Sequence, residues 1–140
     1  MKKLTLFAAI LALGVQSCKE KEKETSKPSL STRQQALIGK DWKIKTYYDN
    51  GQNKTNTIPA CVMDNVIYHF TDASTGYGDE GATKCDPKDP QKINLTWKLI
   101  NNENTMVVNT SEGPDTLQLV SVSTSEIKLR LDTEEYVLKN

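Results

Sequence analysis

The segment INLTWKL, residues 93–99, decides the fold class because its hydrophobic pattern repeats every second residue. In an extended chain, successive side chains point to opposite faces. The polar residues of this segment therefore share one face, and the other face carries Ile93, Leu95, Trp97 and Leu99. This alternation is typical of a β-strand that is wet on one side and buried on the other.

The same alternation recurs on both sides of this segment, between short runs of turn-forming residues. The further expected strands are WKIKTYY (42–48), VIYHF (66–70), TMVVNT (105–110), TLQLVSV (116–122), EIKLRL (126–131) and EYVLK (135–139). Seven or eight short strands, each wet on one side, predict an all-β fold in which consecutive hairpins lie side by side. We expect a small up-and-down antiparallel β-barrel of about eight strands over residues 33–140, with a sandwich as the main alternative.

Two finer expectations follow from this pattern. A short helix is expected at residues 32–38, capped by Ser31 or Thr32 and ended by Gly39. Strict alternation places Tyr47 and Ile67 on the opposite faces from Trp42 and Tyr68, and so outside the barrel.

Residues 1–17 have the features of a targeting segment and are set apart from the fold. Two lysines precede an apolar run from Leu4 to Val15, which at about a dozen residues is too short to span a bilayer as a helix. The run ends in Val15-Gln16-Ser17-Cys18, which resembles a bacterial lipobox, although Gln16 departs from the usual small residue. The resemblance implies cleavage before Cys18 and attachment of lipid, such as palmitate chains, to that cysteine.

The segment from 18 to 32, CKEKEKETSKPSLST, contains only one large apolar residue, Leu30. It cannot bury enough surface to offset its ordering entropy and is predicted to be a flexible charged tether. Charged stretches after the cysteine resemble the sorting signal of Bacteroidetes lipoproteins. We therefore expect an outer-membrane protein, anchored by lipid and facing the periplasm or the cell surface.

Charge and cysteine parity narrow the function further. Without residues 1–17 the chain carries sixteen basic and eighteen acidic residues and has no basic stripe, which argues against a nucleic-acid partner.

Three cysteines leave one unpaired in an exported chain. If Cys18 carries lipid, Cys61 and Cys85 remain to form a disulfide. A metal site at these two cysteines would lack the C-x-x-C spacing.

The run LIGKDWKI (37–44), followed by a cysteine-containing loop and a W-x-L strand, resembles the lipocalin-like lipoproteins of Bacteroidetes. The Gly39-to-Trp42 spacing is one residue longer than the G-x-W of true lipocalins. The resemblance covers residues 33–140 and implies a calycin-like barrel, without assigning a ligand. We expect the protein to be a monomer.

Four aromatic residues are candidates for lining a pocket for a small hydrophobic ligand: Trp42, Tyr68, Phe70 and Trp97. The simpler interpretation is that they fill the core of a short barrel, which needs large side chains. In that second case the protein would be a solid interaction module that binds a protein or glycan through its loops, with an exposed patch around Tyr47, Tyr48 and Tyr77.

No chemistry beyond binding is indicated by the sequence. It contains no H-E-x-x-H, G-x-S-x-G or phosphate-binding glycine motif, so we expect no enzyme, no catalytic residue and no cofactor. His69, the only histidine, is expected to point outward. Two acidic loops, TDASTGYGDEG (71–81) and CDPKDP (85–90), could offer oxygen ligands to calcium but lack EF-hand spacing, and no metal is expected.

Overall fold

The structure is a computed structural model that describes residues 29–140. The expected signal peptide (1–17), Cys18 and the tether as far as residue 28 lie outside the described residues. The described chain contains helices α1 (Thr32–Leu37) and α2 (Ala60–Met63), a 3-10 turn η1 (Thr55–Thr57), and the strands β1 (Asp41–Asp49), β2 (Gln52–Asn53), β3 (Val66–Phe70), β4 (Thr75–Asp79), β5 (Lys92–Ile100), β6 (Thr105–Thr110), β7 (Gly113–Val122), β8 (Glu126–Leu131) and β9 (Glu134–Lys139).

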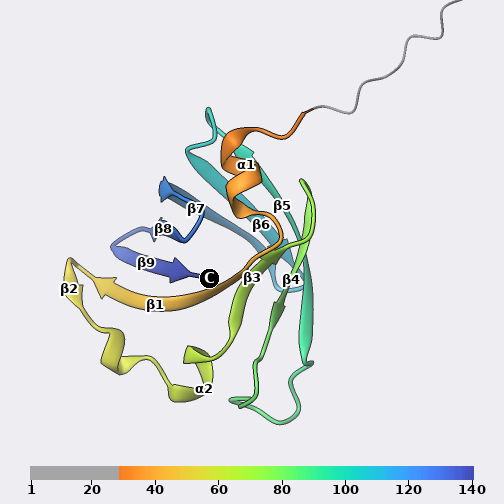
Figure 1. The fold of residues 1–140 in the computed structure, drawn as a ribbon. Coiled ribbons are helices and arrows are strands. Elements are labelled where there is room, and N and C mark those ends of the chain that lie inside the picture. Colours follow the sequence, from red (N-terminus) through yellow and green to blue (C-terminus); the bar gives the residue numbers. More distant parts are fainter. Residues whose placement is uncertain (1–28) are drawn as a thin grey trace, which may run out of the picture.

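Strands β1 and β3–β9 form a closed antiparallel barrel of eight strands, as expected from the alternating pattern (Figure 1). From β3 to β9 each strand pairs with the next one in the chain, and β1 pairs with β3 on one side and with β9 on the other. The β1–β9 pairing closes the sheet and removes its free edges. The two-residue strand β2 only extends β1 as a hairpin beyond the wall.

Inward side chains of the wall strands form one hydrophobic core. Trp42, Phe70, Met106 and Ile127 are completely buried, and they come from four different strands. Leu95 and Trp97 of β5 are buried, as the alternation in residues 93–99 predicts. The core is therefore built from inward residues of seven of the eight wall strands, and β4 contributes none of them.

Helix α1 lies across one end of this barrel (Figure 1). Ser31 caps it: the Ser31 hydroxyl accepts from the Gln34 amide, and the Gln34 side chain accepts from the Ser31 amide, both at 3.1 Å. Leu37 is fully buried in the core, and its carbonyl accepts a hydrogen bond from the Trp42 indole at 2.9 Å. Gly39 then turns the chain into β1 with a φ of 74°, a conformation that glycine adopts without steric cost.

The segment 71–81, expected to be an acidic loop, contains strand β4 (Thr75–Asp79). Its sequence, TGYGD, has no apolar alternation. The glycines are needed because β3 passes very close: a Cβ on Gly76 would stand 2.3 Å from the His69 carbonyl oxygen. The sequence of β4 therefore reflects the close approach of β3, and it carries no hydrophobic alternation that would predict a strand.

Two irregularities in the strand pairing overturn the expected directions of Tyr47 and Ile67. In β1 the register shifts between Ile44 and Thr46, so that Tyr47 pairs with the inward-facing Tyr136. In β3 it shifts between Val66 and His69, and Ile67 packs against the core together with Tyr68. An extra residue in one strand reverses the alternation beyond it.

Candidate ligand-binding site

The two ends of the barrel are built differently, and this difference places the candidate site. At the α1 end, Trp42, Phe70 and Trp97 fill the interior, with at most 3% of each side chain exposed. The rings of Phe70 and Trp97 lie 4.4 Å apart, and the Trp97 indole donates to the Asp72 carbonyl at 3.0 Å. We call this the closed end; it leaves no room for a ligand among these three side chains.

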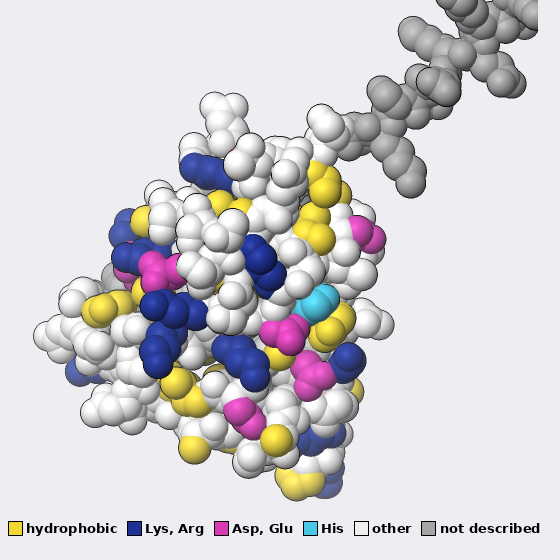
Figure 2. Space-filling view, viewed as in Figure 1, with side chains coloured by type: hydrophobic (Ala, Val, Ile, Leu, Met, Phe, Trp, Pro, Cys, Tyr) yellow, Lys and Arg dark blue, Asp and Glu magenta, His cyan; other side chains and the backbone are white. Residues whose placement is uncertain are grey.

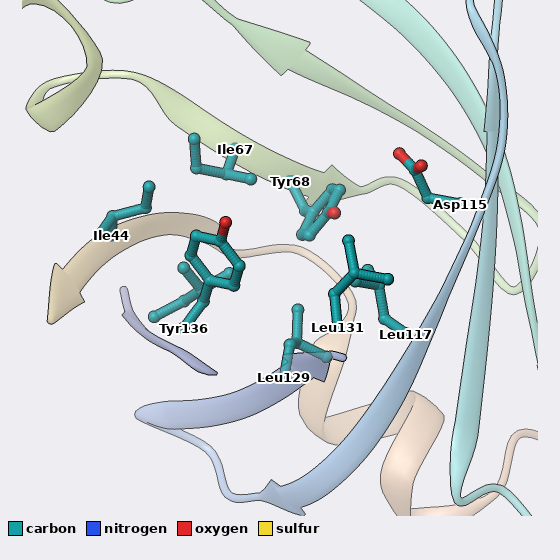
Figure 3. A pocket seen from close by; sticks show the side chains of 9 residues that line it. Ile44, Ile67, Tyr68, Asp115, Leu117, Leu129, Leu131 and Tyr136 are labelled. Atoms are coloured by element: carbon teal, nitrogen blue, oxygen red, sulfur yellow. The ribbon is translucent and has the colours of Figure 1, made fainter. Parts of the chain in front are cut away.

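A pocket of about 250 Å³ opens at the opposite, open end of the barrel (Figure 3). Side chains from β1, β3, β7, β8 and β9 converge on it, and most of them are aliphatic. The lining residues are Ile44, Ile67, Tyr68, Asp115, Leu117, Leu129, Leu131, Tyr136 and Leu138. Of the four aromatic candidates from the sequence, only Tyr68 lines this pocket, and it stacks at 5.5 Å on Phe70 of the closed end.

Tyr68 also separates this pocket from a smaller one. The second pocket, of about 150 Å³, shares Ile67 and Tyr68 with the first and continues toward Ile93 and Thr110. The Tyr68 ring thus forms a wall of both pockets.

The polar groups of the open end are arranged around one carboxylate. Glu134 accepts hydrogen bonds from the hydroxyls of Tyr47 at 2.6 Å and Tyr136 at 2.7 Å, and the two rings are stacked with centroids 5.0 Å apart. These hydrogen bonds lower the pKa of Glu134. The bond to Glu134, followed by burial, raises the pKa of Tyr47 to about 12. The rim therefore carries a charged carboxylate and two protonated phenols at neutral pH.

Tyr68 and Asp115 are the other polar residues that line the pocket. Burial, with a smaller contribution from the negative charge of Asp115, raises the pKa of Tyr68, so its hydroxyl stays protonated. Asp115 pairs with the buried Val108 across β6 and β7, which puts both residues on the inner face of the barrel. Figure 3 shows the Asp115 carboxylate beside the pocket on the same side as Tyr68.

Asp115, Glu134 and Tyr136 are residues of this end that the sequence pattern did not predict. The expected strand began at Thr116, yet extending its alternation back from Leu117 would have placed Asp115 on the inner face. Glu134 and its neighbour Glu135 point to different faces: Glu135 pairs with Arg130 at 2.8 Å, while Glu134 bonds the tyrosines. The three tyrosines of the expected exposed patch do not share a face: Tyr47 turns inward, and Tyr77 stacks on His69 at 4.6 Å.

His69 lies on the outer wall, away from the pocket. Its ring nitrogen Nδ1 is 2.6 Å from the Asp41 carboxylate, and the histidine is visible at the surface beside an acidic side chain (Figure 2). On the face that Figure 2 shows, acidic and basic side chains are interspersed, and hydrophobic side chains occur in small groups. This face offers no broad apolar surface.

The acidic loops form turns. The Asp72 carboxylate accepts hydrogen bonds from the amides of Ser74 and Thr75 at 2.8 Å, and such bonds lower its pKa to about 2. Asp79 accepts from Gln91 at 2.8 Å and from the Gly81 amide at 3.0 Å. Across residues 29–140 no three His, Cys, Asp or Glu side chains are grouped as metal ligands.

The two long open-end loops are joined by the Cys61–Cys85 disulfide that the sequence analysis expected. Cys61 lies in α2, in the chain between β2 and β3, and Cys85 lies between β4 and β5. Asp64 adds a second link, since its carboxylate accepts from the amides of Ala82 at 3.0 Å and Thr83 at 3.2 Å.

In the part of the chain that the structure describes, no helix has the length and apolar character needed to cross a bilayer.

No protein-family model matches this sequence, and no curated protein matches it. Among solved structures, the chain is similar to the crystal structure of a lipocalin-like protein from Bacteroides uniformis, with a TM-score of 0.56 and 13% sequence identity. The superposition covers 75% of this chain and 98% of the other. At this identity the likeness shows the fold alone: the chain shares the lipocalin-like β-barrel of that protein.

Proposed function

We propose that this protein is a lipid-anchored outer-membrane protein that holds a small hydrophobic ligand in the open-end pocket. The observation that carries the binding proposal is an apolar pocket at one end of a barrel whose other end is filled by α1 and the aromatic core. Pockets that are concave and apolar, with a few polar groups at defined positions, are typical of small-molecule sites.

The size of the pocket limits its ligand. About 250 Å³ is below the roughly 300–1,000 Å³ of common ligand pockets. The ligand is therefore a compact molecule, or the end of a longer chain whose remainder stays outside the barrel. We infer a binding protein that acts without a catalytic residue, a cofactor or a nucleic-acid partner. We also infer that it is a monomer.

Anchoring through Cys18 is compatible with access to this pocket. The described chain begins beside α1 at the closed end (Figure 1). The pocket lies at the other end of the barrel. The thirteen residue-to-residue steps from Cys18 to Ser31 span at most about 45 Å when fully extended. A barrel held at this end presents its pocket away from the point of attachment. Acyl-labelling of the full chain and of Cys18→Ser, with fractionation of the membranes, tests the anchor; label that persists in the variant contradicts it.

Ligand binding can be tested by filling the pocket from its rim. Leu131 lines the pocket and is 37% exposed, whereas Val120 is 40% exposed and is not among the lining residues. Leu131→Trp should weaken the binding of a fluorescent apolar probe by roughly tenfold or more, because the indole takes the place of the ligand, and tenfold is only about 1.4 kcal/mol. The matched control, Val120→Trp, should bind the probe like the unmodified protein.

Native mass spectrometry of protein purified from its own host gives a second readout. A stoichiometric small molecule that is lost in Leu131→Trp and kept in Val120→Trp supports the proposal. Protein that carries no such molecule and binds no probe contradicts it, and favours an interaction module whose disulfide-linked loops contact a protein or glycan.

A further inference from the structure

We infer that the open-end pocket selects ligands with a positively charged head, such as a small alkylammonium, and that Asp115 takes up this head. The inference deepens the proposed function and rests on it. It adds the chemical class of the ligand, which the apolar lining by itself leaves open.

The first argument is the charge of the lining. Asp115 is the only charged residue among the nine that line the pocket. Within residues 29–140, the lysines and arginine that form ion pairs do so with other acids: Lys92 with Asp79, Arg130 with Glu135, and Lys139 with Glu126. The Asp115 carboxylate has no such partner in the described chain. A ligand therefore meets a negative charge without a protein cation to neutralise it.

The second argument is where this carboxylate lies. Leu117, two residues further along β7, is buried in the core, so Asp115 is one step nearer to solvent on the same inner face. Its side chain is exposed at the rim of the pocket, while the aliphatic lining residues Leu117, Leu129 and Leu138 form the deeper part. An amphiphile whose chain occupies the aliphatic part would bring its head to the level of Asp115.

The third argument is the set of groups around the head. The rings of Tyr68 and Tyr136 line the same pocket and offer π-faces that attract cations. The Tyr136 hydroxyl is already donated to Glu134, whose negative charge lies beside the rim. Both an ammonium and a neutral alcohol could bond to Asp115, but only the ammonium gains from the two carboxylates and the rings. A carboxylate head would be repelled by the same groups.

The test compares three probes with one chain length, octylammonium, octanol and octanoate, by displacement of a fluorescent apolar dye from the full chain. We expect octylammonium to bind roughly two- to fivefold more tightly than octanol, as for a partly exposed ion pair, and octanoate to bind most weakly. This preference should shrink as the salt concentration rises, because exposed charges are screened.

Substitutions at Asp115 assign the preference to this residue. Asp115→Asn should bring octylammonium close to octanol and leave octanol unchanged, and Asp115→Lys should make octanoate the best of the three. Glu112, in the neighbouring turn between β6 and β7, is the matched control because it is exposed and lies outside the pocket lining. Glu112→Gln and Glu112→Lys should keep the order of the unmodified protein.

The outcomes separate this inference from the function on which it rests. Equal binding of octanol and octylammonium, or tighter binding of octanoate, overturns the cationic selectivity but leaves a hydrophobic binding protein. A preference for octylammonium that survives Asp115→Lys overturns the assignment to Asp115. If none of the three probes displaces the dye, or if no dye binds, both proposals fail.

Discussion

The closed and the open end of this barrel share the same eight strands, but the connections between the strands differ at the two ends. At the closed end the strands are joined by short turns, such as 101–104 between β5 and β6, and α1 covers them. The Arg33 guanidinium of α1 donates to the Glu103 carbonyl in that turn. At the open end the connections include two long loops, 54–65 and 80–91, which are joined by a disulfide.

The side chains follow the same division. Large aromatic residues exclude water from the closed end and donate their indole N–H groups to carbonyls, so that no polar atom of Trp42 or Trp97 is left without a partner. At the open end, the stacked Tyr47 and Tyr136 bring their hydroxyls to the Glu134 carboxylate. One end thus stabilises the barrel by burial, and the other keeps a space that can be filled by a ligand.

The largest effect is expected from Trp42, at the centre of the closed end. Trp42→Ala removes a fully buried ring and its hydrogen bond to Leu37, and should lower the free energy of unfolding by about 3–5 kcal/mol. Urea denaturation measures this loss. Trp42→Phe keeps most of the packing and should cost clearly less. A loss for Trp42→Ala below about 1 kcal/mol, the average for any point mutant, would mean that the closed end is not the stabilising half.

The disulfide is expected to have the second-largest effect, and to act at the open end. Cys61 and Cys85 are 24 residues apart, and replacing both with serine should cost roughly 3–4 kcal/mol by the loop-entropy argument. Hydrogen exchange should speed up most in the loops 54–65 and 80–91, while Trp42 and its neighbours in β1 stay protected. Exchange that increases equally at both ends would show that the two ends are not independent.

The smallest effect is expected from Glu134, and it appears as a pH dependence. Because hydrogen bonds lower the folded-state pKa of Glu134, they stabilise the protein above the ordinary glutamate pKa, and this contribution is lost as the pH falls through the folded value. The difference in unfolding free energy between the unmodified protein and Glu134→Gln should therefore shrink as the pH is lowered below about 4.5.

The alkaline side gives an independent readout of the same carboxylate. Tyr47 should ionise at about pH 12 in the unmodified protein, and in Glu134→Gln its pKa should move down toward the ordinary value of about 10. Phenolate absorbance follows this titration. Glu135→Gln is the matched control, since Glu135 pairs with Arg130 and should leave Tyr47 unchanged. Identical titrations of all three proteins would contradict the role of Glu134.

Much of the wall could be read from the sequence because the alternation of side chains is local to each strand. The core positions Trp97, Leu117 and Ile127 follow directly from it. Strand β4 was missed because its residues were selected by the crowding against β3, which the sequence of β4 does not show. The predicted directions of Tyr47 and Ile67 were wrong because a register shift depends on two paired strands and is not visible in the sequence of one.

The candidate site was predicted least well, for the same reason. The sequence offered four aromatic residues, and three of them fill the closed end while Tyr68 alone lines the pocket. Which residues meet at the open end depends on where β1 pairs with β9 and on the register of β7 against β6. These pairings bring Tyr136 and Asp115 to one pocket although they are far apart along the chain.

The sequence by itself determined the strand pattern, the capped helix before the first strand and the pairing of Cys61 with Cys85. These features depend on side-chain period, local hydrogen bonding and cysteine parity, which are readable along a single chain. Only the tertiary structure decided how the barrel closes, which end is filled and which residues face the remaining space. Those outcomes depend on register between strands, and a shift of one residue in register exchanges the inside and the outside of the wall.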